Sequence, residues 1–98
     1  MQGKNDVDIL LAKSFKELAV HCPIEKITIK EITDGAGVIR PTFYNHFQDK
    51  YELLEKIILT ELLEPIGILI ENRMVTEAFV LLFSSIEKDR DFYMQAVR

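Results

Sequence analysis

The segment from Thr28 to Phe47 constrains the fold more than any other part of the chain, because it holds two short helical patterns separated by glycines. Thr28 followed by Glu31 is a capping-box pattern, which predicts a helix start. Gly35 and Gly37 mark the end of this helix. Its apolar stripe consists of Ile29, Ile32 and Ala36. A helix of about two turns is marginal in water, so it must be held by packing on its neighbours.

A second short helix is predicted to start between Ile39 and Pro41, because proline fits the first helical turn, where its missing N–H costs nothing. Its apolar side is formed by Val38, Phe43 and Phe47. Two short helices joined by a glycine-containing turn are typical of a helix-turn-helix, which inserts its second helix into the major groove of DNA.

The segments on either side of this motif also predict helices. Apolar residues recur at helical spacing over residues 7–22, with Asn5 or Asp6 as the expected start cap. Pro23 cannot continue this helix. Asp49 is the expected cap of a further helix, whose apolar residues extend to Leu63.

The pattern is expected to break or kink at Pro65 and Gly67, because a residue before proline, here Glu64, is biased out of the helical region. The apolar run 66–70 is too short to assign. Residues 75–86 again show helical spacing, and Asp89 is expected to cap a last helix. No segment argues for a sheet, so the predicted fold class is all-α.

Composition excludes several classes of protein. No apolar run reaches the roughly 18 residues that span a membrane. The single cysteine, Cys22, excludes an intramolecular disulfide and is typical of a reducing cytoplasm. No nucleophile is paired with a base, no phosphate loop is present, and no ligands support a metal beside His21, so neither an enzyme, a cofactor nor a metal is expected.

The formal charge of −4 argues against unspecific binding to DNA. However, the charges of residues 1–50 cancel, and the whole acidic excess lies in residues 51–98. A few well-placed cations in the front half therefore remain available for a specific DNA site.

The outer face of the predicted helix-turn-helix carries groups that suit DNA. Arg40 can bind guanine bidentately, and Pro41 and Thr42 can contact a thymine methyl or a phosphate. The hydroxyl of Tyr44 and the ammonium of Lys50 suit phosphate oxygens. The remaining candidates, at the amino end of the first short helix, are Thr28 and Lys30, where backbone N–H groups favour anions.

The run Thr42-Phe43-Tyr44-Asn45-His46-Phe47, after Ala36-Gly37-Val38 and before Asp49-Lys50, resembles the tetracycline-repressor (TetR) family over about residues 7–63. The resemblance implies a three-helix DNA-binding domain, a linking helix and a helical regulatory body that dimerises and usually binds a small ligand. It places Lys30, Arg40, Pro41 and Thr42 nearest the bases, and Thr28, Tyr44 and Lys50 on phosphates, with Asn45 and His46 as weaker candidates. The tail around Asp89–Tyr93 resembles the branch of dihydroxyacetone-kinase regulators.

Two positions depart from the family pattern. Ile39 stands where members often have a capping serine, and the arm over residues 1–8 is less basic than usual. The chain is also short, so a complete effector pocket is not expected within it.

We therefore expect a DNA-binding domain over residues 6–66, with its helix-turn-helix at 28–47, and the incomplete start of a regulatory and dimerisation domain over 67–98. The expected protein is a cytoplasmic transcription regulator, classed as a repressor, that binds a palindromic operator as a homodimer. A small-molecule effector would bind at or beyond the carboxyl end. The alternative is a TetR-like protein-interaction module that docks a partner protein without binding DNA.

Overall fold

The computed structural model describes the backbone of residues 3–97 and the side chains of residues 6–97, and this part contains helices and no strand. The helices in chain order are α1 (Gly3–His21), the 3-10 turn η1 (Ile24–Lys26), α2 (Ile29–Ala36), α3 (Arg40–His46), α4 (Lys50–Ile58), the π-helical segment η2 (Leu59–Leu63), α5 (Glu64–Glu71), α6 (Val75–Lys88) and α7 (Arg90–Ala96). The predicted all-α fold is confirmed.

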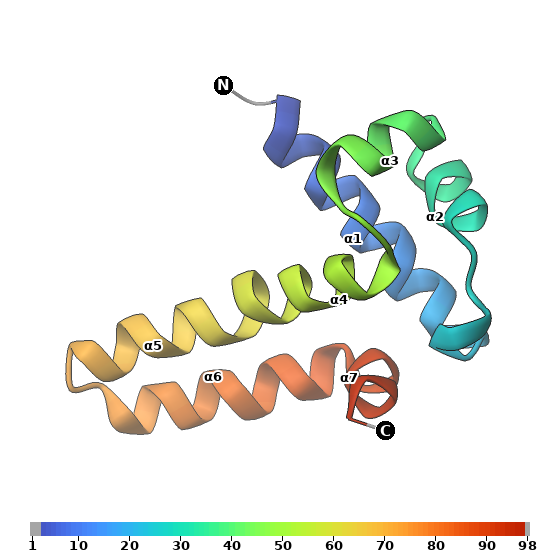
Figure 1. Cartoon of the computed structure of the whole chain (residues 1–98). Coiled ribbons are helices and arrows are strands. Elements are labelled where there is room, and N and C mark those ends of the chain that lie inside the picture. Colours follow the sequence, from blue (N-terminus) through green and yellow to red (C-terminus); the bar gives the residue numbers. More distant parts are fainter. Residues whose placement is uncertain (1–2, 98) are drawn as a thin grey trace.

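The helices form a three-helix head and a hairpin (Figure 1). The head consists of α1, α2 and α3. From it, α4, η2 and α5 continue as one rod, α6 runs back beside the rod, and α7 returns to the head. No helix of the described residues is long and apolar enough to cross a membrane.

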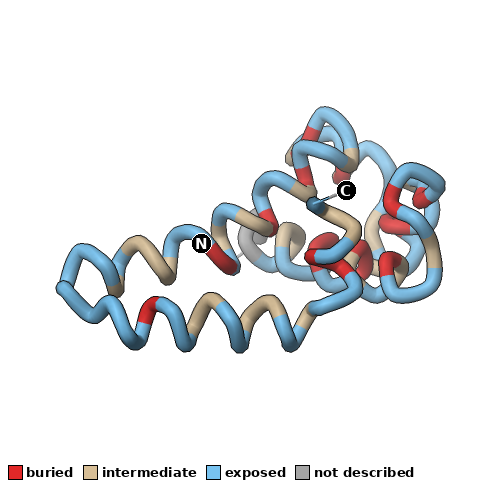
Figure 2. Tube along the Cα trace, turned by 90° about the horizontal axis from the view of Figure 1, so that it is seen from below, coloured by how far each residue is buried: buried red, intermediate tan, exposed pale blue. Residues whose placement is uncertain are grey.

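The core lies in the head, in the adjoining part of the rod and in α7, and it does not extend to the α5–α6 turn. Phe15 of α1 is fully buried and meets Phe92 of α7 edge to face, with ring centroids 5.9 Å apart. Phe43 of α3 and Phe47, which follows that helix, are also buried, as predicted. By contrast, residues around the α5–α6 turn are exposed, and Figure 2 shows this end of the hairpin mostly in pale blue. The head and the base of the hairpin therefore share one core.

The predicted caps of α2 and α4 are confirmed. Thr28 Oγ1 accepts from the Glu31 N–H, and the Glu31 carboxylate accepts from the Thr28 N–H, completing the capping box. Gly37 ends α2 in the left-handed region at φ 74°, which suits a residue without a Cβ. Asp49 Oδ1 accepts from the Glu52 N–H at 2.9 Å.

Three predictions about helix ends were wrong, and the first concerns the amino end. The helix α1 begins at Gly3, so Asn5 and Asp6 lie inside it and do not cap it. Residues 3–8 are accordingly helical, and of the expected arm residues 1 and 2 lie outside the described residues. Gly35 likewise lies within α2, and Gly37 alone ends the helix.

The second wrong boundary is the break at Pro65, which lies inside a continuous rod. Glu64 is helical at φ −65° and ψ −48°, although it precedes proline. The π-helical turn explains this, because the Glu64 N–H bonds the Leu59 carbonyl five residues back. In this wider turn the preceding carbonyl groups are less tightly spaced, so the proline ring avoids the clash that it would make with a carbonyl in a regular helix. The unassigned run 66–70 forms the body of α5.

The third correction concerns Asp89. It precedes α7 as predicted, but its side chain makes no capping hydrogen bond. Instead its carboxylate pairs with Lys16 Nζ of α1 at 3.2 Å, beside a second pair between Lys16 and Glu61 at 2.6 Å. Burial lowers the pKa of the Lys16 ammonium, but the hydrogen bond and charge of Glu61, helped by Asp89, outweigh it and leave that pKa above its usual value.

Candidate nucleic-acid interface

The helix α3 has one face fixed in the core and one face turned to solvent. Phe43 and Phe47 are buried, with their ring centroids 5.7 Å apart. Because a helix turns 100° per residue, Pro41 and Asn45 lie opposite Phe43, and Arg40 and Tyr44 lie on one flank between the two sides. All four of these residues are exposed. The core thus sets which side chains α3 offers to a partner.

Arg40 is the best-placed cation on this face. Among the described residues it forms neither an ion pair nor a side-chain hydrogen bond, so its guanidinium can turn to a ligand. Tyr44 is 54% exposed, and its ring packs edge to face on Phe43 with centroids 5.5 Å apart. Thr42, by contrast, is half-buried on the flank of the helix.

The start of α3 is uncapped by a side chain. Ile39 occupies the N-cap position with extended backbone and makes no side-chain cap hydrogen bond, and it is 68% exposed. Pro41 lies in the first turn, as predicted. The Thr42 N–H donates to the Ile39 carbonyl at 3.0 Å, so the backbone of Ile39 caps this turn in place of its side chain, and an apolar side chain stands beside Arg40.

The amino end of α2 presents Thr28 and Lys30, but both already have partners. Thr28 is held in the capping box, where the Glu31 carboxylate adds negative charge to the helix end. Lys30 Nζ pairs with Asp34 at 2.8 Å, and both side chains are largely exposed. Exposed pairs at this spacing contribute about 0.3–0.5 kcal/mol, so a phosphate can replace Asp34 at low cost.

Lys50, the last candidate, lies at the start of α4 and faces inward. Its Nζ donates to the carbonyl oxygens of Glu25 and Ile27, at 2.9 and 2.8 Å. An ammonium has three donors, so one N–H remains after these two bonds. The lysine thus holds the link between α1 and α2, a role that its place in the sequence does not indicate.

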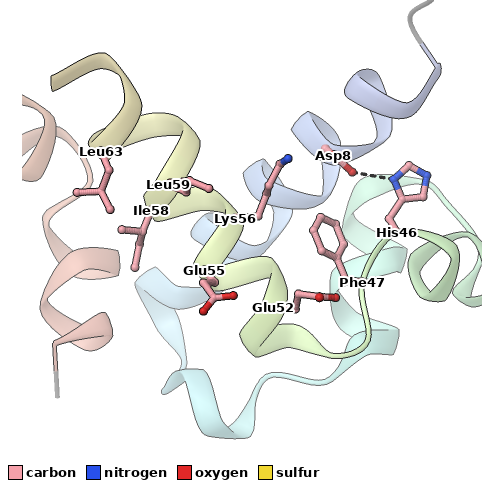
Figure 3. Close-up of a pocket in the computed structure, with 9 residues that line it drawn as sticks. All are labelled: Asp8, His46, Phe47, Glu52, Glu55, Lys56, Ile58, Leu59 and Leu63. Atoms are coloured by element: carbon pink, nitrogen blue, oxygen red, sulfur yellow. Dashed lines mark hydrogen bonds and ion pairs between the residues drawn. The ribbon is translucent and has the colours of Figure 1, made fainter. Parts of the chain in front are cut away.

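His46 ends α3 and has a structural partner. Its Nδ1 lies 2.7 Å from Asp8 Oδ1 of α1, and both side chains are mostly buried. The pair forms one end of an open groove of about 400 Å³ beside α4, where Phe47 and Leu59 contribute apolar walls (Figure 3). Carboxylates of Glu52 and Glu55 also line it.

Sequence reasoning missed the close contact that sets α2 against α1. A Cβ added at Gly35 would lie 2.4 Å from Ser14 Oγ, and Ser14 is buried and donates to the Ile32 carbonyl at 2.8 Å. From the sequence, Gly35 is predicted to end a helix, and Ser14 is an ordinary polar residue of the first helix. A serine facing a glycine across two helices carries no local signal.

A head of this kind, with α2 and α3 as a helix-turn-helix packed on α1, defines a class of DNA-binding regulators. Residues 15–57 match the family described as bacterial regulatory proteins, tetR family. The chain is also 29% identical over 86 residues to the HTH-type dhaKLM operon transcriptional activator DhaS of Lactococcus lactis subsp. lactis (strain IL1403). That alignment covers 88% of this chain and 46% of the activator. No solved structure matches the chain significantly.

These matches show that the chain is similar to TetR-type regulators over its helix-turn-helix head, and that it is similar to a regulator of the dhaKLM-related branch over most of its length. The chain spans about half the length of the curated relative that it matches.

Proposed function

We propose that the protein recognises an operator through α3 and binds it as a homodimer in the cytoplasm. The observation that carries this proposal is the solvent-facing side of α3, where Arg40 and Tyr44 stand on a helix pinned by Phe43 and Phe47. Arg40 and Pro41 would meet base edges with Thr42. Tyr44, Thr28, Lys30 and Lys50 would bind phosphates, with Lys50 using its remaining N–H.

The homodimer would place two copies of α3 in successive major grooves, about one helical turn apart, on a palindromic site. The exposed apolar side of α6 supports association, since Phe79 and Phe83 stack there while more than half exposed. Residues 6–66 would act as the DNA-binding unit and residues 67–98 as the first part of a body that dimerises. An effector bound at or beyond the carboxyl end would change the spacing of the two heads.

A gel-shift titration on the DNA upstream of the gene tests the proposal. Arg40→Ala should weaken specific binding by roughly 1–3 kcal/mol, or about 5- to 150-fold, if the guanidinium binds a guanine. Arg73→Ala is the matched control, because it removes the same charge from the α5–α6 turn at the far end of the hairpin (Figure 1). Equal binding by Arg40→Ala, Arg73→Ala and the unchanged chain would refute the role of α3.

The alternative, a protein-docking module, rests on the sparse positive charge of the head and the acidic half over residues 51–98. Salt separates the two functions. DNA binding should fall by about 0.9 log unit per log unit of salt for each phosphate contacted. A partner complex that survives high salt, together with no DNA affinity, would favour the alternative.

A further inference from the structure

The link over residues 23–27, between α1 and α2, is held by side chains from two distant helices. From α7, the Gln95 amide accepts from the Ile24 N–H at 2.7 Å and donates to the carbonyls of Ala19 and Cys22, at 2.6 and 2.9 Å. Lys50 of α4 binds the carbonyls near the other end of the link. The path of the link is thus fixed by residues 23 or more positions away in the chain.

Gln95 suits this position because its amide carries both donors and an acceptor. The last carbonyls of a helix have no partner within it, and here Ala19 and Cys22 stand at the end of α1. The Gln95 NH2 group donates to both of these carbonyls, while the amide oxygen accepts from the first N–H of η1. No aliphatic side chain can make these bonds.

Other contacts of α7 restrict the position of Gln95. Asp89, Phe92 and Gln95 are spaced three apart, which places them along one side of the helix. Phe92 is buried against Phe15, and Asp89 pairs with Lys16. All three therefore contact α1 or the turn that follows it, so α7 and the end of α1 form one rigid unit.

The link leads directly to the phosphate-facing end of α2. The Ile27 carbonyl accepts a hydrogen bond from Lys50, and the next residue, Thr28, is the N-cap of α2. Lys30 lies in the first turn of this helix. We propose that Gln95 is a positioning residue for DNA binding, which acts from α7 through the link over residues 23–27 to place the amino end of α2 against a phosphate. This proposal rests on the proposed DNA-binding function.

Gln95→Met in the 98-residue chain tests it, because methionine has a similar length and keeps none of the three hydrogen bonds. We expect operator affinity to fall about tenfold, as for one lost bond to a charged phosphate. The salt slope of binding should also become shallower by about 0.9 for each phosphate released. The matched control is Ala78→Gly in α6, which lowers stability by about 1 kcal/mol and touches neither the link nor the head.

Urea denaturation shows which variants remain folded at the titration temperature. A Gln95→Met protein that is less stable but binds DNA with the affinity and salt slope of the unchanged chain overturns the proposal. If Gln95→Met does not fold, Gln95→Glu replaces it, because the carboxylate keeps the acceptor for Ile24 and loses both donors. Unaltered affinity and slope in that variant likewise overturn the proposal. Failure of the unchanged chain to bind any operator instead refutes the proposed function itself.

Discussion

Gly35→Ala probes how closely α2 must approach α1 for the helix-turn-helix to form. The new Cβ would lie 2.4 Å from Ser14 Oγ and 3.4 Å from Ser14 Cβ. The hydroxyl must rotate away, and its buried bond to the Ile32 carbonyl is lost. Leaving such a group unsatisfied costs about 1–3 kcal/mol. The gain in helix propensity from glycine to alanine is at most about 1 kcal/mol.

The two effects predict a net loss of about 0–2 kcal/mol in the free energy of unfolding. Gly67→Ala supplies the control, since a Cβ there meets nothing within 4 Å and only the propensity gain remains. Urea denaturation of both variants should therefore differ by about 1–3 kcal/mol, which is the cost at Ser14. Adding Ser14→Ala should remove most of the difference, because the clashing oxygen is gone.

Equal stabilisation by Gly35→Ala and Gly67→Ala would refute this account, since the close contact at Ser14 would then carry no cost. A Gly35→Ala loss that persists unchanged in the Ser14→Ala background would also contradict it. In that case the destabilisation would come from another part of the α1–α2 contact.

Three further variants test other parts of the structure. Gly37→Ala should lower the free energy of unfolding in urea by about 1–2 kcal/mol, because alanine is strained at a left-handed φ of 74°; an unchanged value would contradict the turn geometry. Lys16→Met should cost on the order of 1 kcal/mol at pH 7, because Glu61 and Asp89 lose their cation. Since folding raises the pKa of Lys16, this stabilisation should persist at neutral pH and vanish as the pH rises above the usual lysine pKa of about 10.4. A difference in the free energy of unfolding between the two proteins that stays constant to high pH would refute the ion pairs. Lys50→Met should lower the free energy of unfolding by about 1 kcal/mol, because the hydrogen bonds to the carbonyls of Glu25 and Ile27 are lost, and it should make the salt slope of DNA binding shallower by about 0.9. An unaltered free energy of unfolding would contradict the role of Lys50 in holding the link.

Much of the head was predictable because its signals are local. The capping box at Thr28, the cap at Asp49 and the left-handed Gly37 depend on residues within a few positions of each other. The burial of Phe43 and Phe47 follows from helical spacing. The predicted break at Pro65 was wrong because the rule that a residue before proline leaves the helical region does not account for the π-helical turn over Leu59–Leu63.

The candidate DNA-facing residues differ in how free their side chains are. Arg40 and Tyr44 are exposed, whereas Lys30 pairs with Asp34 and Lys50 bonds two carbonyls. Sequence spacing gives the face of a helix, but it does not give the competing partners. Those depend on which elements the fold brings alongside.

By itself, then, the sequence determined the all-α class, the helix-turn-helix over residues 28–47 and its resemblance to TetR regulators. Caps, turns and periodicity act within a few residues, so no tertiary information was needed for them. Only the tertiary structure decided that Ser14 faces Gly35, that Lys16 joins Glu61 and Asp89, and that Gln95 holds the end of α1. These contacts join residues 21 to 76 positions apart, and they form only when the packing of the core brings the helices together.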